Sequence, residues 1–145
     1  MGRGGVRATK CEGDGATPAG CWPIRRVLYR PDRIAPPLSA FAWKPLRSDA
    51  GWCDAPGDPR YNRPVRLPYE GRHERLWRDD EIYDLIAVLG YNDDPVEDGA
   101  GSAVFLHIAR PDFAPTEGCV ALARADLLEF LSGAESATRV CIALP

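Results

Sequence analysis

Glycine and proline interrupt this chain so often that they limit the kind of fold it can form. The sequence holds 14 Gly and 14 Pro in 145 residues, about 19% against a usual share of roughly 12%. Both residues disfavour long helices, because proline removes a backbone donor and glycine loses much entropy on ordering. We therefore expect a mainly β fold with mixed β-sheets, one or two short helices and long covering loops. The length fits a single domain over residues 1–145.

Composition excludes several classes of protein. Hydrophobic residues make up 45% and charged residues 27% of the chain, which is typical of a soluble globular protein. The basic residues are mostly isolated arginines among prolines, so we expect no nucleic-acid partner. No apolar run reaches the length of a membrane helix, and residues 1–7 lack the apolar core of a signal peptide. We therefore expect no membrane insertion.

Local patterns predict strands in the second half of the chain. Residues 82–89 are apolar on both alternating faces, as in a central strand covered on each side. Residues 102–109 alternate, with His107 on the less bulky face near the end of the strand. Further elements are predicted as a short strand at 119–122, a helix at 124–131 ended by Gly133, and a terminal strand at 138–144.

The first half is predicted to be less regular. The turn-forming residues of segment 1–23 indicate a loop, and residues 25–30 indicate a short strand. Prolines and glycines recur throughout residues 31–68, which predicts a long ordered excursion over one sheet. Loops of that length in a compact domain are usually functional or covering elements.

The five cysteines, Cys11, Cys21, Cys53, Cys119 and Cys141, include no C-x-x-C pair. Their odd number leaves at least one free thiol. A disulfide among the first three is compatible with export, but spacing does not reveal pairing. Cys141 alternates with apolar neighbours and is predicted to pack in the core. A metal site from Cys119, His107 and a loop cysteine is conceivable, yet the spacing is not that of a ligand set, so we expect no metal and no cofactor.

Cys119 and His107 are the candidates for chemistry. A nucleophilic cysteine must form a thiolate, which requires a base nearby and donors for the oxyanion that it creates. His107 ends one predicted strand and Cys119 begins the next, twelve residues later. Gly118 allows a sharp turn that would direct main-chain N–H groups at a carbonyl oxygen. The alternative is that both are ordinary buried residues, as free cysteine and strand histidine often are.

Three segments resemble the YkuD-type L,D-transpeptidase family, and more closely its branch of small ErfK/YbiS-like proteins. These are residues 10–20, the Gly-Trp-Cys-Asp cluster at 51–54 with Tyr-Asn at 61–62, and residues 102–122. The ordered set of His107 followed by Thr116-x-Gly118-Cys119 is the most specific part. The resemblance covers nearly the whole chain, and it implies a YkuD-like catalytic fold over residues 1–145 that lacks one or more first strands. It also suggests that Met1 is a late start, with a strand and an export signal missing before it.

The resemblance implies a cysteine-dependent L,D-transpeptidase that uses peptidoglycan stem peptides as donor and acceptor. In the family, the thiol attacks the diaminopimelate carbonyl of a stem tetrapeptide, expels D-alanine and holds a thioester. A side-chain amine of a second stem then forms a 3–3 crosslink. Cys119 matches the nucleophile, His107 the general base and Gly118 the oxyanion turn. In the family, a backbone carbonyl commonly orients the histidine.

The resemblance also suggests substrate-binding residues, although core, loop or surface roles are open for each: Tyr83, Asn92, Trp77, Arg78 and Thr116. This chain departs from the family pattern where it has Glu117 and Ala121. The stretch from His107 to Cys119 is also shorter than usual. A carboxylate beside the thiol would raise its pKa unless Glu117 points away.

Two alternatives remain beside the transpeptidase. Water as acceptor would give an L,D-carboxypeptidase or a crosslink-cleaving peptidase from the same site. A non-catalytic peptidoglycan-binding scaffold would keep the fold without the chemistry. The family implies a location in the cell envelope or periplasm, although the chain as given has no signal peptide.

Overall fold

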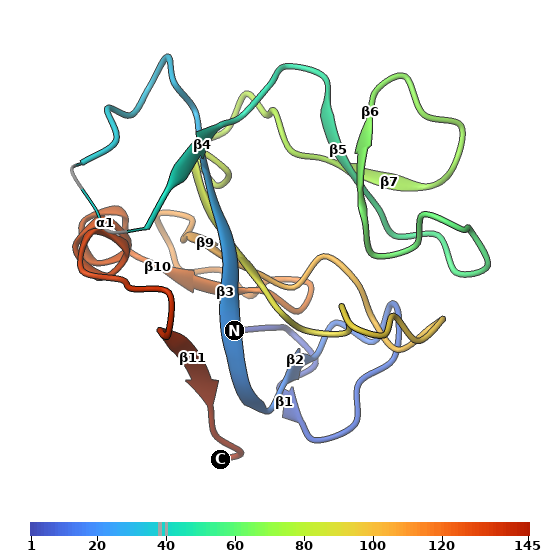
Figure 1. The fold of residues 1–145 in the computed structure, drawn as a ribbon. Coiled ribbons are helices and arrows are strands. Elements are labelled where there is room, and N and C mark those ends of the chain that lie inside the picture. Colours follow the sequence, from blue (N-terminus) through green and yellow to red (C-terminus); the bar gives the residue numbers. More distant parts are fainter. Residues whose placement is uncertain (38, 40) are drawn as a thin grey trace.

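The computed structural model describes residues 1–37, 39 and 41–145, and it is mainly β, as predicted. The main sheet has six strands: β10, β9, β8, β3 and β11 in that order, with β4 beside β3 (Figure 1). The elements are β1 (Val6–Arg7), β2 (Thr17–Pro18), β3 (Gly20–Tyr29), β4 (Trp43–Pro45), β5 (Ala50–Cys53), β6 (Pro64–Arg66), β7 (His73–Arg75), β8 (Leu85–Leu89), β9 (Phe105–Ile108), β10 (Val120–Leu122), α1 (Arg124–Ser132) and β11 (Arg139–Ile142).

The main sheet is mixed. Strand β8 lies antiparallel between β3 and β9, whereas β9 and β10 run parallel. All five residues of β8 are buried, which confirms that this strand is central and covered on both sides. It begins at Leu85 rather than at residue 82, because a turn precedes it in which the Asp84 N–H bonds to Glu81 O at 3.0 Å.

The two faces of strand β9 pack in two separate hydrophobic clusters. Leu106 and Ile108 pack in a cluster with the buried face of α1, while Phe105 packs in the second cluster with Cys119. The predicted alternation over residues 102–109 is therefore confirmed. The strand is shorter than predicted and starts at Phe105. The backbone before it is not extended, because Ala103 has a left-handed φ of 52°.

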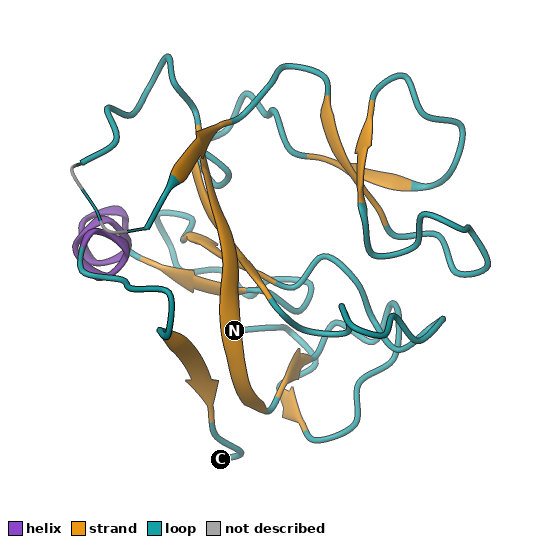
Figure 2. Ribbon diagram, in the orientation of Figure 1, coloured by secondary structure: helices purple, strands orange, loops and turns teal. Residues whose placement is uncertain are grey.

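The helix α1 covers one face of the main sheet. Leu127 and Leu131 of α1 are fully buried in the first cluster, and Gly133 follows the helix as predicted. Figure 2 shows α1 beside the main sheet, with the smaller sheet of β5–β7 set apart from it. No helix in the described part of the chain is long and apolar enough to cross a bilayer.

The second face is covered by the excursion that was predicted over residues 31–68. It is more regular than expected: it contains β4, β5 and β6, and β5 lies between β6 and β7 in a three-stranded sheet. Residues 38 and 40 of this segment lie outside the described residues. The Trp52 ring of β5 meets the Phe105 ring edge-on, with centroids 5.3 Å apart. The excursion therefore packs on the face of β9 that carries Phe105.

The N-terminal segment differs from its prediction as a loop. Residues 20–29 form the ten-residue strand β3, and two short strands, β1 and β2, pair in parallel before it. Residues 20–23 pair with β11, which is more than 110 residues away in the sequence. Such long-range pairing outweighs local turn preferences, and it is not visible in the composition of the segment.

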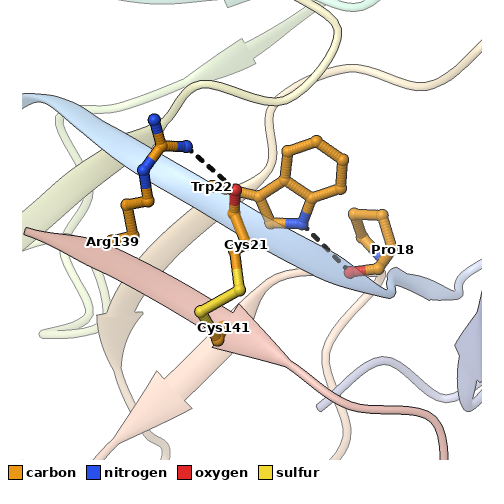
Figure 3. Close-up of a disulfide and its surroundings, with 5 residues drawn as sticks. All are labelled: Pro18, Cys21, Trp22, Arg139 and Cys141. Carbon is orange, nitrogen blue, oxygen red and sulfur yellow. Dashed lines mark hydrogen bonds between the residues drawn. A yellow bond between two sulfur atoms is a disulfide. The ribbon is translucent and has the colours of Figure 1, made fainter.

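Cys21 and Cys141 form a disulfide, which corrects two of the predictions (Figure 3). They face each other as register partners of β3 and β11, with Cα atoms 4.0 Å apart. Cys141 is exposed rather than packed in the core, and Cys21 lies in a strand rather than a loop. Beside the bridge, Arg139 donates to Cys21 O at 3.4 Å, and the indole of Trp22 donates to Pro18 O at 3.2 Å.

Candidate active site

The β9–β10 pair places Cys119 and His107 on the same face of the sheet. Ala121 is the register partner of His107, and Cys119 precedes Ala121 by two residues. Because side chains alternate along a strand, residues two apart point to the same side. Cys119 and His107 both line one pocket of about 330 Å³. The predicted nucleophile and base therefore share a single cavity.

The Cys119 thiol is held by backbone groups. Its Sγ donates to Ala103 O at 3.2 Å and accepts from the Phe105 N–H at 3.4 Å. The residue is only 8% exposed. Burial and, to a lesser extent, the negative charge of Glu74 together raise the pKa of this thiol to about 12. The thiol is therefore protonated at neutral pH.

The imidazole of His107 is oriented by its own strand. Nδ1 lies 2.9 Å from Ile108 O, and because a carbonyl oxygen only accepts, Nδ1 carries the hydrogen. This tautomer leaves the lone pair on Nε2, as a general base requires. Burial lowers the pKa of His107, so the ring is neutral. Among the described residues no hydrogen bond joins the ring to the Cys119 thiol.

The turn before the nucleophile requires a glycine. Gly118 has a φ of 132°, and an added Cβ would lie 2.7 Å from Ala16 O. Thr116 Oγ1 donates to Cys119 O at 2.6 Å and accepts from the Gly118 N–H at 3.2 Å. The Arg3 N–H adds a bond to Thr116 O at 2.8 Å. The turn is thus fixed both by its own threonine and by the start of the chain.

Glu117 points away from the thiol. It forms an ion pair with Arg3 at 2.8 Å, and its side chain is 74% exposed. The carboxylate whose charge raises the thiol pKa is instead Glu74 of β7. Sequence reasoning missed Glu74, because it lies 45 residues before Cys119, just after the excursion, and no spacing pattern links the two.

Comparison with known proteins identifies the family of the chain. Residues 1–142 match the model of the YkuD family, described as the L,D-transpeptidase catalytic domain. The chain belongs to the YkuD family. The resemblance proposed from the sequence is confirmed. Neither a curated protein nor a solved structure matches the chain.

Asn62 is a hydrogen-bond hub behind the nucleophile of this YkuD domain. Its Oδ1 accepts from the Trp52 indole at 2.9 Å and from the Ala103 N–H at 3.1 Å. Its Nδ2 donates to Tyr91 O at 3.1 Å and to Asn92 O at 2.6 Å. The sequence analysis used Asn62 only for the family resemblance. The amide holds Ala103, whose carbonyl oxygen in turn holds the thiol.

Lys10 places a positive charge beside the Gly118 turn. Its ammonium pairs with Asp14 at 2.7 Å, and both side chains are more than nine-tenths buried. An added Cβ on Gly118 would lie 3.4 Å from Lys10 Nζ. This charge lowers the pKa of the Cys119 thiol and partly offsets burial and Glu74. Lys10 lines the same pocket.

Only some of the predicted substrate-binding residues line the pocket. Tyr83, Arg78 and Thr116 line the pocket. Trp77 and Asn92 do not line it. The Arg30 guanidinium lies over the Trp77 ring, 3.8 Å from the ring centroid. The Asn92 side chain donates to backbone carbonyl oxygens of its own loop.

Two further observations bear on the earlier expectations. Arg78 forms an ion pair with Asp80 at 2.7 Å, which is the surface pairing considered from the sequence. No group of three potential metal ligands occurs within the described residues, so the alternative of a metal site gains no support.

Proposed function

We propose that the protein is a cysteine-dependent L,D-transpeptidase that acts on peptidoglycan stem peptides through a thioester on Cys119. One observation carries the proposal. The thiol and an imidazole with a free Nε2 lie on one face of β9–β10, in one pocket, beside a turn that only glycine can form. Membership of the L,D-transpeptidase family supports the same conclusion.

The first half-reaction transfers the donor acyl group to sulfur. Nε2 of His107 takes the thiol proton, and the thiolate attacks the diaminopimelate carbonyl of a stem tetrapeptide. We assign the Cys119 N–H as the donor to the oxyanion, since the Gly118 N–H already donates to Thr116 Oγ1. The C–N bond then breaks, His107 returns its proton to the leaving amine, and D-alanine departs.

The second half-reaction releases the acyl group. The side-chain amine of a second stem attacks the thioester carbonyl, the C–S bond breaks, and a 3–3 crosslink forms. Attack by water gives a tripeptide instead, which is the carboxypeptidase reaction. Because the same nucleophile and base serve both outcomes, the acceptor decides the product.

The disulfide supports a proposed location in the cell envelope. Structural disulfides persist in oxidising compartments such as the periplasm. The Cys21–Cys141 bridge is exposed and joins the edge strand β11 to its neighbour β3 in the main sheet. A location outside the cytoplasm would place the protein with the peptidoglycan that the family acts on.

The test is a product analysis with purified disaccharide tetrapeptide. We expect crosslinked dimers and free D-alanine, measured by liquid chromatography and mass spectrometry. Cys119→Ala should give neither product. Cys11→Ala is the matched control, since this thiol is exposed and lies outside the pocket. Unchanged tetrapeptide with the folded wild-type protein would contradict the proposal and favour a binding scaffold.

A further inference from the structure

The acidic residues that line the pocket differ in whether a cationic side chain contacts them. Glu12 and Asp54 both lie near Arg72, at 3.6 and 3.1 Å, and Glu117 lies 2.8 Å from Arg3. Among the described residues, no arginine, lysine or histidine nitrogen lies within 4.0 Å of Glu74. Its carboxylate is held instead by the phenol of Tyr83, which donates to Oε1 at 2.5 Å. Glu74 is thus the pocket carboxylate with no cation in direct contact within the described part of the chain, although the charge of nearby Arg78, which is paired with Asp80, lowers its pKa.

Glu74 lies in the same part of the pocket as the proposed nucleophile and base. Tyr83 is 4% exposed, and its ring meets that of His107 edge-on, with centroids 5.2 Å apart. Carboxylate, phenol and imidazole therefore form a continuous series along the pocket that also holds Cys119. The charge of Glu74 is, after burial, the second cause of the raised pKa of the Cys119 thiol.

A partly buried carboxylate with no cation in direct contact is costly to keep ionised, and a cationic ligand would compensate it. The second half-reaction brings such a ligand, since a primary amine enters as an ammonium ion at neutral pH. An ammonium cannot attack a thioester until it loses a proton. Burial raises the pKa of Glu74, which makes its carboxylate a better base than an exposed one.

We propose that Glu74 is the acceptor-site residue, which binds the incoming ammonium of a primary amine and takes its first proton. This rests on the proposed function. One proton passes from the ammonium to Glu74. The neutral amine then forms the C–N bond while the C–S bond breaks, and its second proton reaches the leaving thiolate through His107. Glu74 then releases its proton to solvent, which balances the proton that the expelled D-alanine amine takes up from solvent after the first half-reaction.

The two half-reactions should therefore respond differently to loss of this charge. Donor acylation needs the thiolate, which a negative Glu74 disfavours, so acylation should not slow when the charge is removed. Transfer to an amine needs the carboxylate and should fail. Hydrolysis of the thioester uses neutral water and should continue. The ratio of dimer to tripeptide is therefore the specific readout.

The test compares Glu74→Gln with the wild type. Glutamine keeps an oxygen that can accept from Tyr83, and it removes the charge. We expect acylation by the tetrapeptide at no less than the wild-type rate, with a dimer-to-tripeptide ratio at least about tenfold lower. Glu117→Gln is the matched control, since Glu117 lines the same pocket but is 74% exposed and already paired with Arg3, and its ratio should remain that of the wild type.

Hydroxylamine separates a role in proton transfer from a structural one. This nucleophile is largely unprotonated at neutral pH, so its attack on the thioester needs no base. We expect Glu74→Gln to form the hydroxamate at the wild-type rate. A ratio unchanged by Glu74→Gln, or an equal loss of hydroxamate and dimer, would overturn the inference while the acyl-enzyme remains. Absence of any acylation in the wild type would overturn the proposed function itself.

Discussion

The Cys119 thiol donates its hydrogen bond to the carbonyl oxygen of Ala103, 3.2 Å away. In this arrangement the proton is held by the backbone, and the imidazole of His107 is neutral. The nucleophile and base are therefore placed in one pocket without forming a thiolate–imidazolium pair in advance. Ionisation of the thiol must accompany the approach of the donor carbonyl.

The reactivity of the free thiol should rise with pH well beyond neutrality. With a pKa raised to about 12, the thiolate fraction of Cys119 increases roughly tenfold per pH unit below that value. We expect iodoacetamide to label Cys119 about 100 times faster at pH 9 than at pH 7, as measured by peptide mass spectrometry in a Cys11→Ala background. A rate that levels off near pH 7 would indicate a preformed thiolate instead.

Removal of the Glu74 charge should shift this profile toward lower pH. Burial is the largest cause of the raised thiol pKa, and the charge of Glu74 is the second. Because a nearby negative charge disfavours the thiolate, Glu74→Gln should lower the thiol pKa and raise the labelling rate at any given pH below it. Slower labelling in this variant at pH 8, with the fold intact by circular dichroism, would contradict the assigned electrostatics.

Loss of the Asn62 hub should impair the nucleophile more than it impairs the fold. Trp52→Phe leaves a smaller aromatic ring beside Phe105 and removes the donor to Asn62 Oδ1. We expect this change to cost about 1 kcal/mol of stability, measured by urea unfolding. Asn62→Ala also frees the Ala103 N–H, and kcat for tetrapeptide turnover should fall by at least about tenfold with little change in KM. Wild-type kcat in Asn62→Ala would exclude this positioning role.

The disulfide should support stability and leave the chemistry unchanged. It closes a sequence separation of 120 residues, and bridges of this kind contribute about 2–4 kcal/mol. We expect Cys141→Ser to lower the free energy of unfolding by that amount under oxidising conditions. In dithiothreitol the two proteins should unfold alike. Equal stability without reductant would show that the bridge is not formed in solution.

The sequence was most informative where a local pattern coincides with a buried element. Residues of β8 are apolar on both faces, and β9 alternates around His107, so both strands could be predicted. The candidate pair of Cys119 and His107 lies near the ends of adjacent strands. The turn before Cys119 could be predicted because residue 118 is a glycine. The main-sheet face that carries the site could thus be predicted from short segments.

Other features depend on contacts that no local pattern records. Strand β3 forms because β8 and β11 pair with it, although its first residues resemble a loop. The same pairing brings Cys21 opposite Cys141. Glu74 reaches the pocket only because β7 packs beside β5 in the excursion. These residues can be read from a single sequence. The strand register that brings them together cannot.

The most direct measurement of the chemistry is the intact mass of the protein after incubation with a carbapenem. The strained lactam carbonyl accepts attack by the thiolate, its C–N bond opens, and no group leaves, so that one inhibitor mass is added. We expect a single adduct on the wild type and on Cys11→Ala, and none on Cys119→Ala. A folded wild-type protein that gains no mass, or an adduct that persists in Cys119→Ala, would contradict Cys119 as the nucleophile.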